Sequence, residues 1–455
     1  MGNIVAKKQS KLDKGSGLEK PFSGYHAKRG VTEDEELTHV GPGTPGGEYL
    51  RLYWQPVALS SELGELPLNV VMLGEELVLF RTRKGKIGLL DRHCSHRGAS
   101  LEYGLTSDEG IVCCYHGWHY ATDGRIIETP NDPTCKVAGN LFHGAYPTHE
   151  YEGIIFAYLG APDDIADFPV FDTFVESDNE MVPFSLPMPC NWLQCLENTQ
   201  DPIHSCFLHT RVSGVQFGVS WGELPELDYV KTPLGMMNIN VRRWKDNLWI
   251  RTTEDMLPNM NQTGSLWLAA EEEESFTRVA LTRWMMPVDN TNTKMIGWRY
   301  FNDRIDVKEG DKSQVGLGKI DFIGQTEDER PYEERQRVPG DFEAIVSQRD
   351  IAIHGLENLT ISDRGVGMLR AMVRQGIRVS KTGRKYASLP RHFDGPIATY
   401  TQDTIIKKPQ CNVDESKLMR EVGREIAKVV RESDKLSPEE RKIAVAKKAE
   451  QLIEL

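Results

Sequence analysis

A short stretch of the chain, residues 94 to 120, contains three cysteines and three histidines. Cys94 and His96 are separated by one residue, Cys113 and His116 by two, and sixteen residues lie between the two pairs. Thiolates and imidazoles in such pairs are typical metal ligands, and a bound metal fixes the loops that carry them. These four side chains therefore constrain the fold more than any other feature of the sequence.

Two kinds of metal group take two cysteines and two histidines. One is a tetrahedral zinc site, and the other is a Rieske [2Fe-2S] cluster, in which two Cys hold one iron and two His hold the other. The spacing favours the cluster, because each of two loops supplies one Cys and one His. Gly98 and Gly117 follow the two histidines, where a loop must turn closely around the cluster. Only Cys113 has the required distance to His116, so its neighbour Cys114 is predicted to be a packed free thiol.

The patterns along the chain predict an α+β protein with two domains. Short apolar runs separated by Gly and Asp turns predict β-strands from residue 53 to about 162. A helical stretch from 188 to about 210, several further strands and then helical periodicity from about 341 follow. We expect an N-terminal tail (1–45), a small cluster-binding β domain (46–163) and a second domain with antiparallel sheet and helices (164–455).

Composition excludes several classes of protein. No apolar run approaches the ~20 residues that a membrane helix requires, so no membrane association is expected. The formal net charge of -13 argues against nucleic acid as a ligand. Eight cysteines are too few for a disulfide scaffold in a chain of 455 residues, and the N-terminus has no apolar signal region. A cytoplasmic protein is predicted.

A second candidate metal site follows in "ENTQDPIHSCFLH", from Glu197 to His209. His204 and His209 are five residues apart, which is about 140 degrees on a regular helix, so they would not converge on one metal. If both are ligands, the helix must end or widen between them, as in a π-bulge. Asp201 lies one turn before His204, where its carboxylate is placed to hold the other nitrogen of the imidazole.

Oxygen-activating Fe(II) sites use two His and one carboxylate, so a third ligand must come from elsewhere in the chain. Asp350 follows the apolar positions Phe342 and Val346 at helical spacing, which would turn its carboxylate toward the core. A buried charge needs a partner such as a metal, and Asp350 is therefore the predicted third ligand. Asp341, beside Gly340, is interpreted as a helix-capping residue.

These motifs resemble those of one family. "CSHRGASL" and "CYHGWHYATDGR" are similar to the cluster loops of bacterial Rieske non-haem iron aromatic-ring oxygenases, and E-x-x-x-D-x-x-H-x-x-x-x-H resembles the iron-binding signature of their α (oxygenase) subunits. "RLYWQPVAL" and "SDRGVGMLR" resemble segments of the phthalate dioxygenase and aryl O-demethylase branch. The resemblance implies a helix-grip-like catalytic domain, a [2Fe-2S] Rieske cluster and a mononuclear Fe(II).

The resemblance also implies a function. Electrons from an NAD(P)H-dependent reductase or ferredoxin would support O₂-dependent hydroxylation or O-demethylation of an aromatic acid or aryl ether. Asp201 would act as the electron-transfer bridge from His116 of a neighbouring subunit to His204, which implies a homotrimer. The alternatives are a Rieske electron-transfer protein without oxygenase activity and a structural zinc protein. Arg242, Arg243 and Arg349 are candidates to meet a substrate carboxylate, although surface salt bridges are the commoner role.

Overall fold

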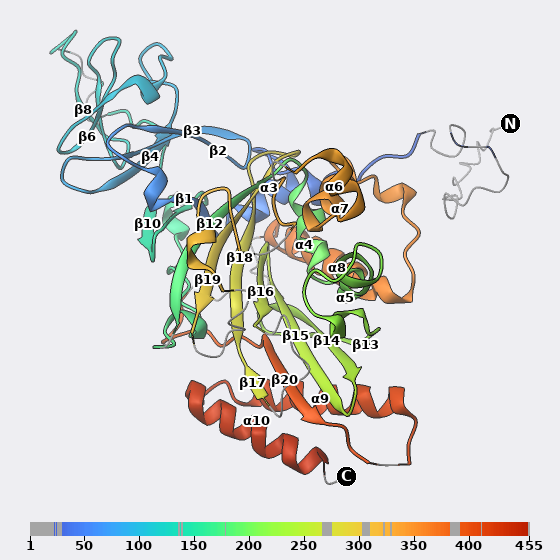
Figure 1. The fold of residues 1–455 in the computed structure, drawn as a ribbon. Coiled ribbons are helices and arrows are strands. Elements are labelled where there is room, and N and C mark those ends of the chain that lie inside the picture. Colours follow the sequence, from blue (N-terminus) through green and yellow to red (C-terminus); the bar gives the residue numbers. More distant parts are fainter. Residues whose placement is uncertain are drawn as a thin grey trace, which may run out of the picture.

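A computed structural model gives the fold (Figure 1). It describes residues 22, 24, 30–134, 137, 140–177, 179–265, 275–302, 310–321, 324–327, 330–382, 392–410 and 412–453. Within these residues the α+β character predicted from the sequence is confirmed.

Three small antiparallel sheets form the N-terminal part. The first has the order β1 (Trp54–Leu59), β11 (Ile154–Tyr158) and β10 (Thr148–Tyr151). The second has the order β2 (Leu68–Met72), β3 (Glu75–Arg81), β4 (Ile87–Asp91) and β9 (Ala145–Tyr146). The third, which carries one of the predicted metal loops, runs β5 (Leu105–Thr106), β6 (Gly110–Val112), β7 (His119–Ala121) and β8 (Ile126–Glu128). This pairing supports a domain boundary near residue 163, which stays a prediction.

One large antiparallel sheet organises the rest of the chain. Its main path is β12 (Glu180–Met188), β19 (Thr293–Phe301), β18 (Val279–Pro287), β16 (Met260–Gly264), β15 (Asn247–Met256), β14 (Gly235–Trp244) and β13 (Glu226–Lys231). β20 (Gln402–Lys407) pairs with β15 and with β17 (Ser275–Thr277). Long antiparallel strands follow from the β-branched and aromatic residues of these segments, which suit a pleated surface.

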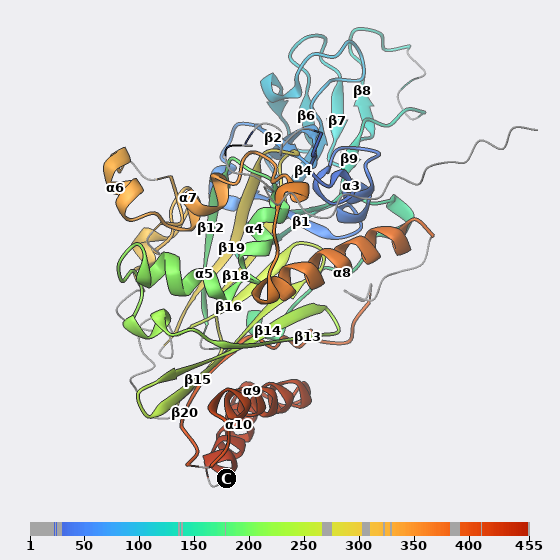
Figure 2. The same ribbon diagram turned by 90° about the vertical axis from the view of Figure 1, so that its right-hand side faces the viewer.

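Helices cover this sheet on both faces. They are α2 (Glu35–Thr38), α3 (Pro45–Leu50), α4 (Trp192–Asn198), α5 (Pro202–Cys206), α6 (Tyr332–Arg337), α7 (Asp341–Val346), α8 (Arg364–Ser380), α9 (Glu415–Glu432) and α10 (Pro438–Ile453). Figure 2 shows β14 and β15 between α9 and α10 on one side and α5 and α8 on the other. Among the helices described, none is both long and apolar enough to cross a bilayer.

The alternation of β14 separates a hydrophobic face from a polar one. Ile239 and Val241 belong to a buried cluster with the apolar side of α9, where Gly423 permits close approach because a Cβ would lie 2.6 Å from Val241 Cγ2. Asn238, Asn240 and Arg242 point to the opposite face, toward α5. Register along one strand therefore places polar side chains beneath the second predicted metal motif.

The predicted N-terminal tail is too long. Leu37, Thr38 and Val40 are buried, and the Asn191 amide donates to the main-chain oxygen of Thr38 at 2.9 Å. Arg374 of α8 also forms ion pairs with acidic residues of this segment. The segment from about residue 34 to 45 therefore belongs to the folded structure.

Candidate active site

The two predicted cluster loops have the same backbone design. Each ends in a glycine with positive φ, Gly98 at 74° and Gly117 at 75°, and each glycine N–H donates to the cysteine carbonyl that opens the loop. A positive φ is costly for other residues, so glycine is required for these turns. Both cysteine N–H groups donate back across their loops, to Ala99 and Trp118, which closes two matching turns.

These turns bring the four predicted ligands together. Cys94 and Cys113 are both buried, and burial together with the neighbouring Cys94 thiol raises the pKa of Cys113. The rings of His96 and His116 lie 4.5 Å apart, centroid to centroid. His96 Nδ1 is buried and has no hydrogen-bond partner among the described residues. A buried nitrogen without a partner, next to a second imidazole on loops that also carry two neighbouring thiols, fits a bound metal cluster.

Other side chains hold these ligands in position. The Trp118 ring stacks on His96 at 4.8 Å with an interplanar angle of 6°, and the Tyr120 hydroxyl lies 2.9 Å from Cys94 Sγ. Hydrogen bonds near cluster sulfurs tune the redox potential of a Rieske centre. Cys114 is free, as predicted, but its side chain is exposed rather than packed.

The second motif forms a site on a broken helix. α5 ends at Cys206 and continues directly as a π-helical turn, Phe207–Arg211 (η5), in which the Val212 N–H bonds to Phe207 O at 2.8 Å. The predicted widening between His204 and His209 is therefore confirmed. It turns both imidazoles to one side, with ring centroids 5.5 Å apart.

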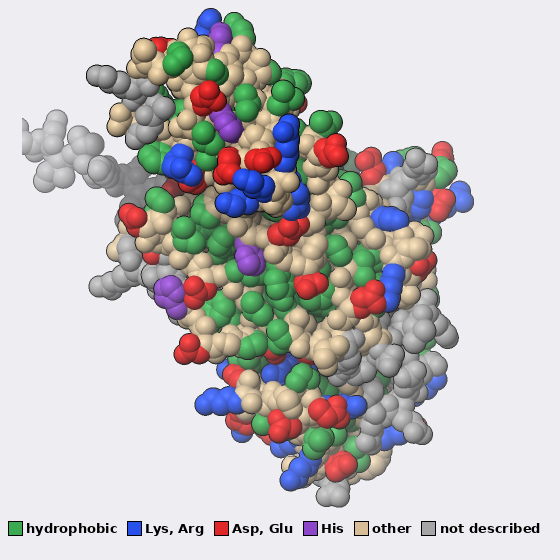
Figure 3. Space-filling model, turned by 90° about the vertical axis from the view of Figure 1, so that its left-hand side faces the viewer, with side chains coloured by type: hydrophobic (Ala, Val, Ile, Leu, Met, Phe, Trp, Pro, Cys, Tyr) green, Lys and Arg blue, Asp and Glu red, His purple; other side chains and the backbone are tan. Residues whose placement is uncertain are grey.

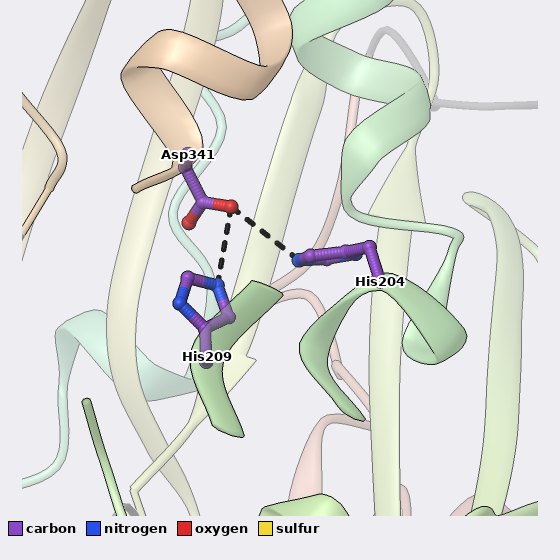
Figure 4. A group of neighbouring side chains, drawn as sticks. All are labelled: His204, His209 and Asp341. Atoms are coloured by element: carbon purple, nitrogen blue, oxygen red, sulfur yellow. Dashed lines mark hydrogen bonds and ion pairs between the residues drawn. The ribbon is translucent and has the colours of Figure 1, made fainter. Parts of the chain in front are cut away.

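Asp341 completes this site (Figure 4). Its Oδ1 lies 3.4 Å from His204 Nε2 and 3.2 Å from His209 Nε2. Burial opposes ionisation of this carboxyl, but the two imidazoles hold the pKa of Asp341 well below its usual range. Two imidazole nitrogens and one carboxylate oxygen that converge in this way fit a mononuclear iron site.

Hydrogen bonds to the Nδ1 atoms fix which nitrogen faces Asp341. His209 Nδ1 lies 2.8 Å from Gln216 Oε1, and His204 Nδ1 contacts the main-chain oxygen of Asp201. The Gln216 amide nitrogen donates to Pro339 O at 2.8 Å, so its oxygen is the atom that faces His209. Because both partners are acceptors, each Nδ1 carries a proton, and each Nε2 could offer its lone pair to a bound metal.

The predicted third ligand, Asp350, is wrong. α7 ends at Val346, so the helical stripe that would turn Asp350 inward does not continue, and its side chain is exposed in a bend. Its main-chain oxygen accepts from the Asn191 N–H at 2.8 Å, which is a structural contact. Asp341 was interpreted as a capping residue because it begins a helix after glycine. Asp341 lies beside the histidines because the chain packs closely where Gly324 meets Gly340. A Cβ on Gly340 would lie 2.3 Å from Gly324 Cα.

Asp201 contacts His204 differently from the prediction. Its carboxylate Oδ1 accepts from the main-chain N–H groups of Ile203 and His204, which caps α5, and Oδ2 is 4.0 Å from His204 Nδ1. His204 Nδ1 bonds to the main-chain oxygen of Asp201. The sequence predicted that the carboxylate of Asp201 would accept this hydrogen bond.

The two histidines and Asp341 lie in the wall of a pocket that holds about 670 Å³ of empty space, including its open mouth. Few apolar side chains line it, among them Phe217, Trp221 and Leu281. Four further residues surround the site, and no sequence motif pointed to them: Gln216, Gln325, Arg251 and Arg283. Of the arginines it named, Arg242 lines the pocket, Arg243 pairs with Glu415 at the surface and Arg349 is exposed.

Comparisons with known proteins agree with this geometry. Residues 53–142 match the model of the Rieske [2Fe-2S] domain. The chain is 39% identical, over 95% of its length and 96% of the other protein, to the tert-butanol monooxygenase / tert-amyl alcohol desaturase oxygenase subunit of Aquincola tertiaricarbonis. The chain belongs to the Rieske oxygenases. Phenoxybenzoate dioxygenase subunit alpha of Ectopseudomonas oleovorans is 33% identical over 79% of this chain and 88% of that protein.

Solved structures show the same fold. Dicamba monooxygenase bound to dicamba has a TM-score of 0.55 at 18% identity and covers 73% of this chain and 99% of its own. The predicted family, with an N-terminal Rieske domain followed by an α+β part, is therefore confirmed. This Rieske oxygenase is an oxidoreductase that incorporates oxygen, and the alternative of an electron carrier without oxygenase activity is not supported.

Proposed function

We propose that the chain is the oxygenase component of a multicomponent system, which receives electrons from a separate reductase or ferredoxin and oxidises a small organic substrate with O₂. The observation that carries this proposal is the convergence of His204, His209 and Asp341 on a pocket. We infer that the cluster is held by Cys94, His96, Cys113 and His116. These four residues alone would serve an electron carrier equally well.

Each metal group supplies one kind of chemistry. When bound, the cluster would supply single electrons, and an iron held by His204, His209 and Asp341 would supply the site for O₂ activation. The protein positions the ligands. Gln216 and the Asp201 main chain accept from the Nδ1 side of the two histidines and so direct both Nε2 atoms toward the metal position, and the pocket walls orient the substrate.

The substrate class in our proposal is an aromatic acid or aryl ether, which would be hydroxylated or O-demethylated. The relatives' names include phenoxybenzoate and, in the protein with 39% identity, a tertiary alcohol. The names of the relatives therefore do not decide between an acid and a neutral substrate. The side chains of the pocket must decide between them.

The test is isotope incorporation. The iron-loaded protein with a surrogate ferredoxin reductase and NADH would be given methoxybenzoates, benzoates and tert-butanol under ¹⁸O₂. We expect substrate-dependent O₂ uptake and ¹⁸O in at least one hydroxylated product, or loss of a methyl group as formaldehyde. Full cluster and iron content without any substrate-dependent O₂ uptake would overturn the proposal.

A further inference from the structure

Arg283 is a half-buried cation in the wall of the pocket. It lies on β18 and lines the same pocket as His204, His209 and Asp341. Among the described residues it forms no ion pair, its Nε has no hydrogen-bond partner, and its one hydrogen bond goes to Met295 Sδ at 3.9 Å. A thioether is a weak acceptor, so the guanidinium is left largely unsatisfied.

Two buried arginines of this region, Arg278 and Arg299, have carboxylate partners. Arg278 lies 3.1 Å from Asp172, and Arg299 lies 3.1 Å from Asp321. A guanidinium removed from water is costly unless it is paired. Within the described residues Arg283, like Arg242, has no carboxylate partner, and both arginines line the pocket.

The charges around the pocket point to an anion. Burial lowers the pKa of Arg283, and the carboxylates of Asp341 and Asp255 oppose that effect only from beyond ion-pair distance. A divalent metal bound by Asp341 would compensate the negative charge of that carboxylate. Arg283 would then have less nearby negative charge to balance its own positive charge. Arg242 adds a second positive charge, because its hydrogen bonds go to neutral groups of Asn240, Pro202 and Ser205.

We propose that Arg283 binds a carboxylate of the substrate and so makes this oxygenase selective for small organic acids over neutral alcohols. This inference rests on the proposed function. The planar guanidinium offers paired donors that match a carboxylate, which fixes the orientation of the substrate as well as its charge. A neutral alcohol in the same place would leave the Arg283 guanidinium without an anion.

The experiment measures affinity as well as turnover. Holoenzyme would be titrated calorimetrically with two pairs of similar size: 3-methoxybenzoate against 3-methoxybenzamide, and 2-hydroxy-2-methylpropanoate against tert-butanol. In the wild type, the acid of at least one pair should bind more tightly than its neutral partner. Arg283→Gln should weaken binding and kcat/KM of that acid by about 30-fold or more, mainly through KM, and leave the neutral compound within a few-fold. Arg283→Lys should restore part of the acid affinity.

The control is Arg243→Gln, because Arg243 is an exposed arginine of β14 in the same sheet and pairs with Glu415. It should leave both members of each pair unchanged. The inference is overturned if wild-type protein binds neither acid, if it prefers the neutral members, or if Arg283→Gln weakens both members equally. Turnover of tert-butanol with ¹⁸O incorporation but without acid preference would leave the proposed function standing while the inference falls.

Discussion

The iron site depends on one carboxylate that begins a helix. Asp341 reaches both Nε2 atoms, whereas Asp350 is exposed. Asp341→Asn should lower the iron content from about three to about two per chain, because the cluster keeps its two irons and the mononuclear iron loses its charged ligand.

Iron and acid-labile sulfide analysis checks this prediction. Asp350→Asn is the matched control and should keep about three irons. If the Asp350 variant loses iron and the Asp341 variant keeps it, Asp350 is the ligand, as the sequence predicted.

A second residue-scale prediction concerns Glu254 of β15, which is fully buried and accepts a hydrogen bond from the Tyr400 N–H at 2.8 Å. Burial raises the pKa of Glu254 to about 8, from an ordinary value of 4.5. Between these values the folded state binds more protons than the unfolded state, so this residue costs stability as pH rises. Glu254→Gln has no such cost.

The difference in unfolding free energy, variant minus wild type, should therefore grow from about pH 5 to pH 8 by at most ~1.4 kcal/mol per pH unit. Urea titrations at several pH values measure this difference. A difference that stays constant across the range would show that Glu254 titrates normally.

At the scale of elements, α8 connects the N-terminal segment to the site. Arg370 pairs with Glu197 of α4, the first residue of the predicted iron motif, and also with Glu357. His354, which lies near Glu357, accepts the Asp34 N–H at 3.1 Å and does not take part in the iron site. The helix thus stabilises α4 from behind, and its packing should matter for stability.

Two glycines of α8 test this packing. A Cβ on Gly376 would lie 2.4 Å from the buried Tyr49 ring, whereas a Cβ on Gly367 would meet no atom within 4 Å. Gly376→Ala should lower the free energy of unfolding by about 1–3 kcal/mol, and Gly367→Ala should raise it by up to about 1 kcal/mol. Opposite shifts in melting temperature are expected, and equal shifts would show that α8 does not pack tightly on α3.

The elements also show how far the sequence could predict this structure. The runs "NLWIRTT" and "KMIGWRYFN" carry a strong local signal and lie in β15 and β19. Five-residue spacing of His204 and His209 predicted the π-helical turn, because no regular helix serves both. Asp341 could not be predicted in this way. Its role depends on the contact of Gly324 with Gly340, and a helix-starting aspartate has a sufficient local explanation.

At the scale of the whole molecule, the two metal sites are far apart within one chain. Figures 1 and 2 both show the loops near β6 at one end and α5 on the other side of the large sheet. We therefore propose, as the family resemblance implies, that electrons cross between the subunits of a homotrimer through Asp201. Figure 3 shows hydrophobic side chains gathered across the middle of one face.

Mixed oligomers test the transfer between chains. Cys113→Ser should disable the cluster, and Asp341→Asn should disable the iron site, so each variant alone should have no coupled turnover. Co-expression with two affinity tags, followed by tandem purification, should give mixed oligomers with measurable turnover, because an intact cluster then faces an intact iron site of another subunit. Inactive mixed oligomers with correct metal content would mean that each chain uses its own two centres.

The exposed thiol of Cys114 offers a way to observe such an encounter. The other cysteines within the described ranges, Cys94, Cys113, Cys190, Cys195 and Cys206, are buried, whereas Cys114 is open to solvent one residue from a proposed cluster ligand. After Cys135 and Cys411 are replaced by serine, a maleimide fluorophore would attach at this position and its emission would report when another protein covers the loop. The neighbour of the ligand thereby becomes a sensor of electron-donor binding.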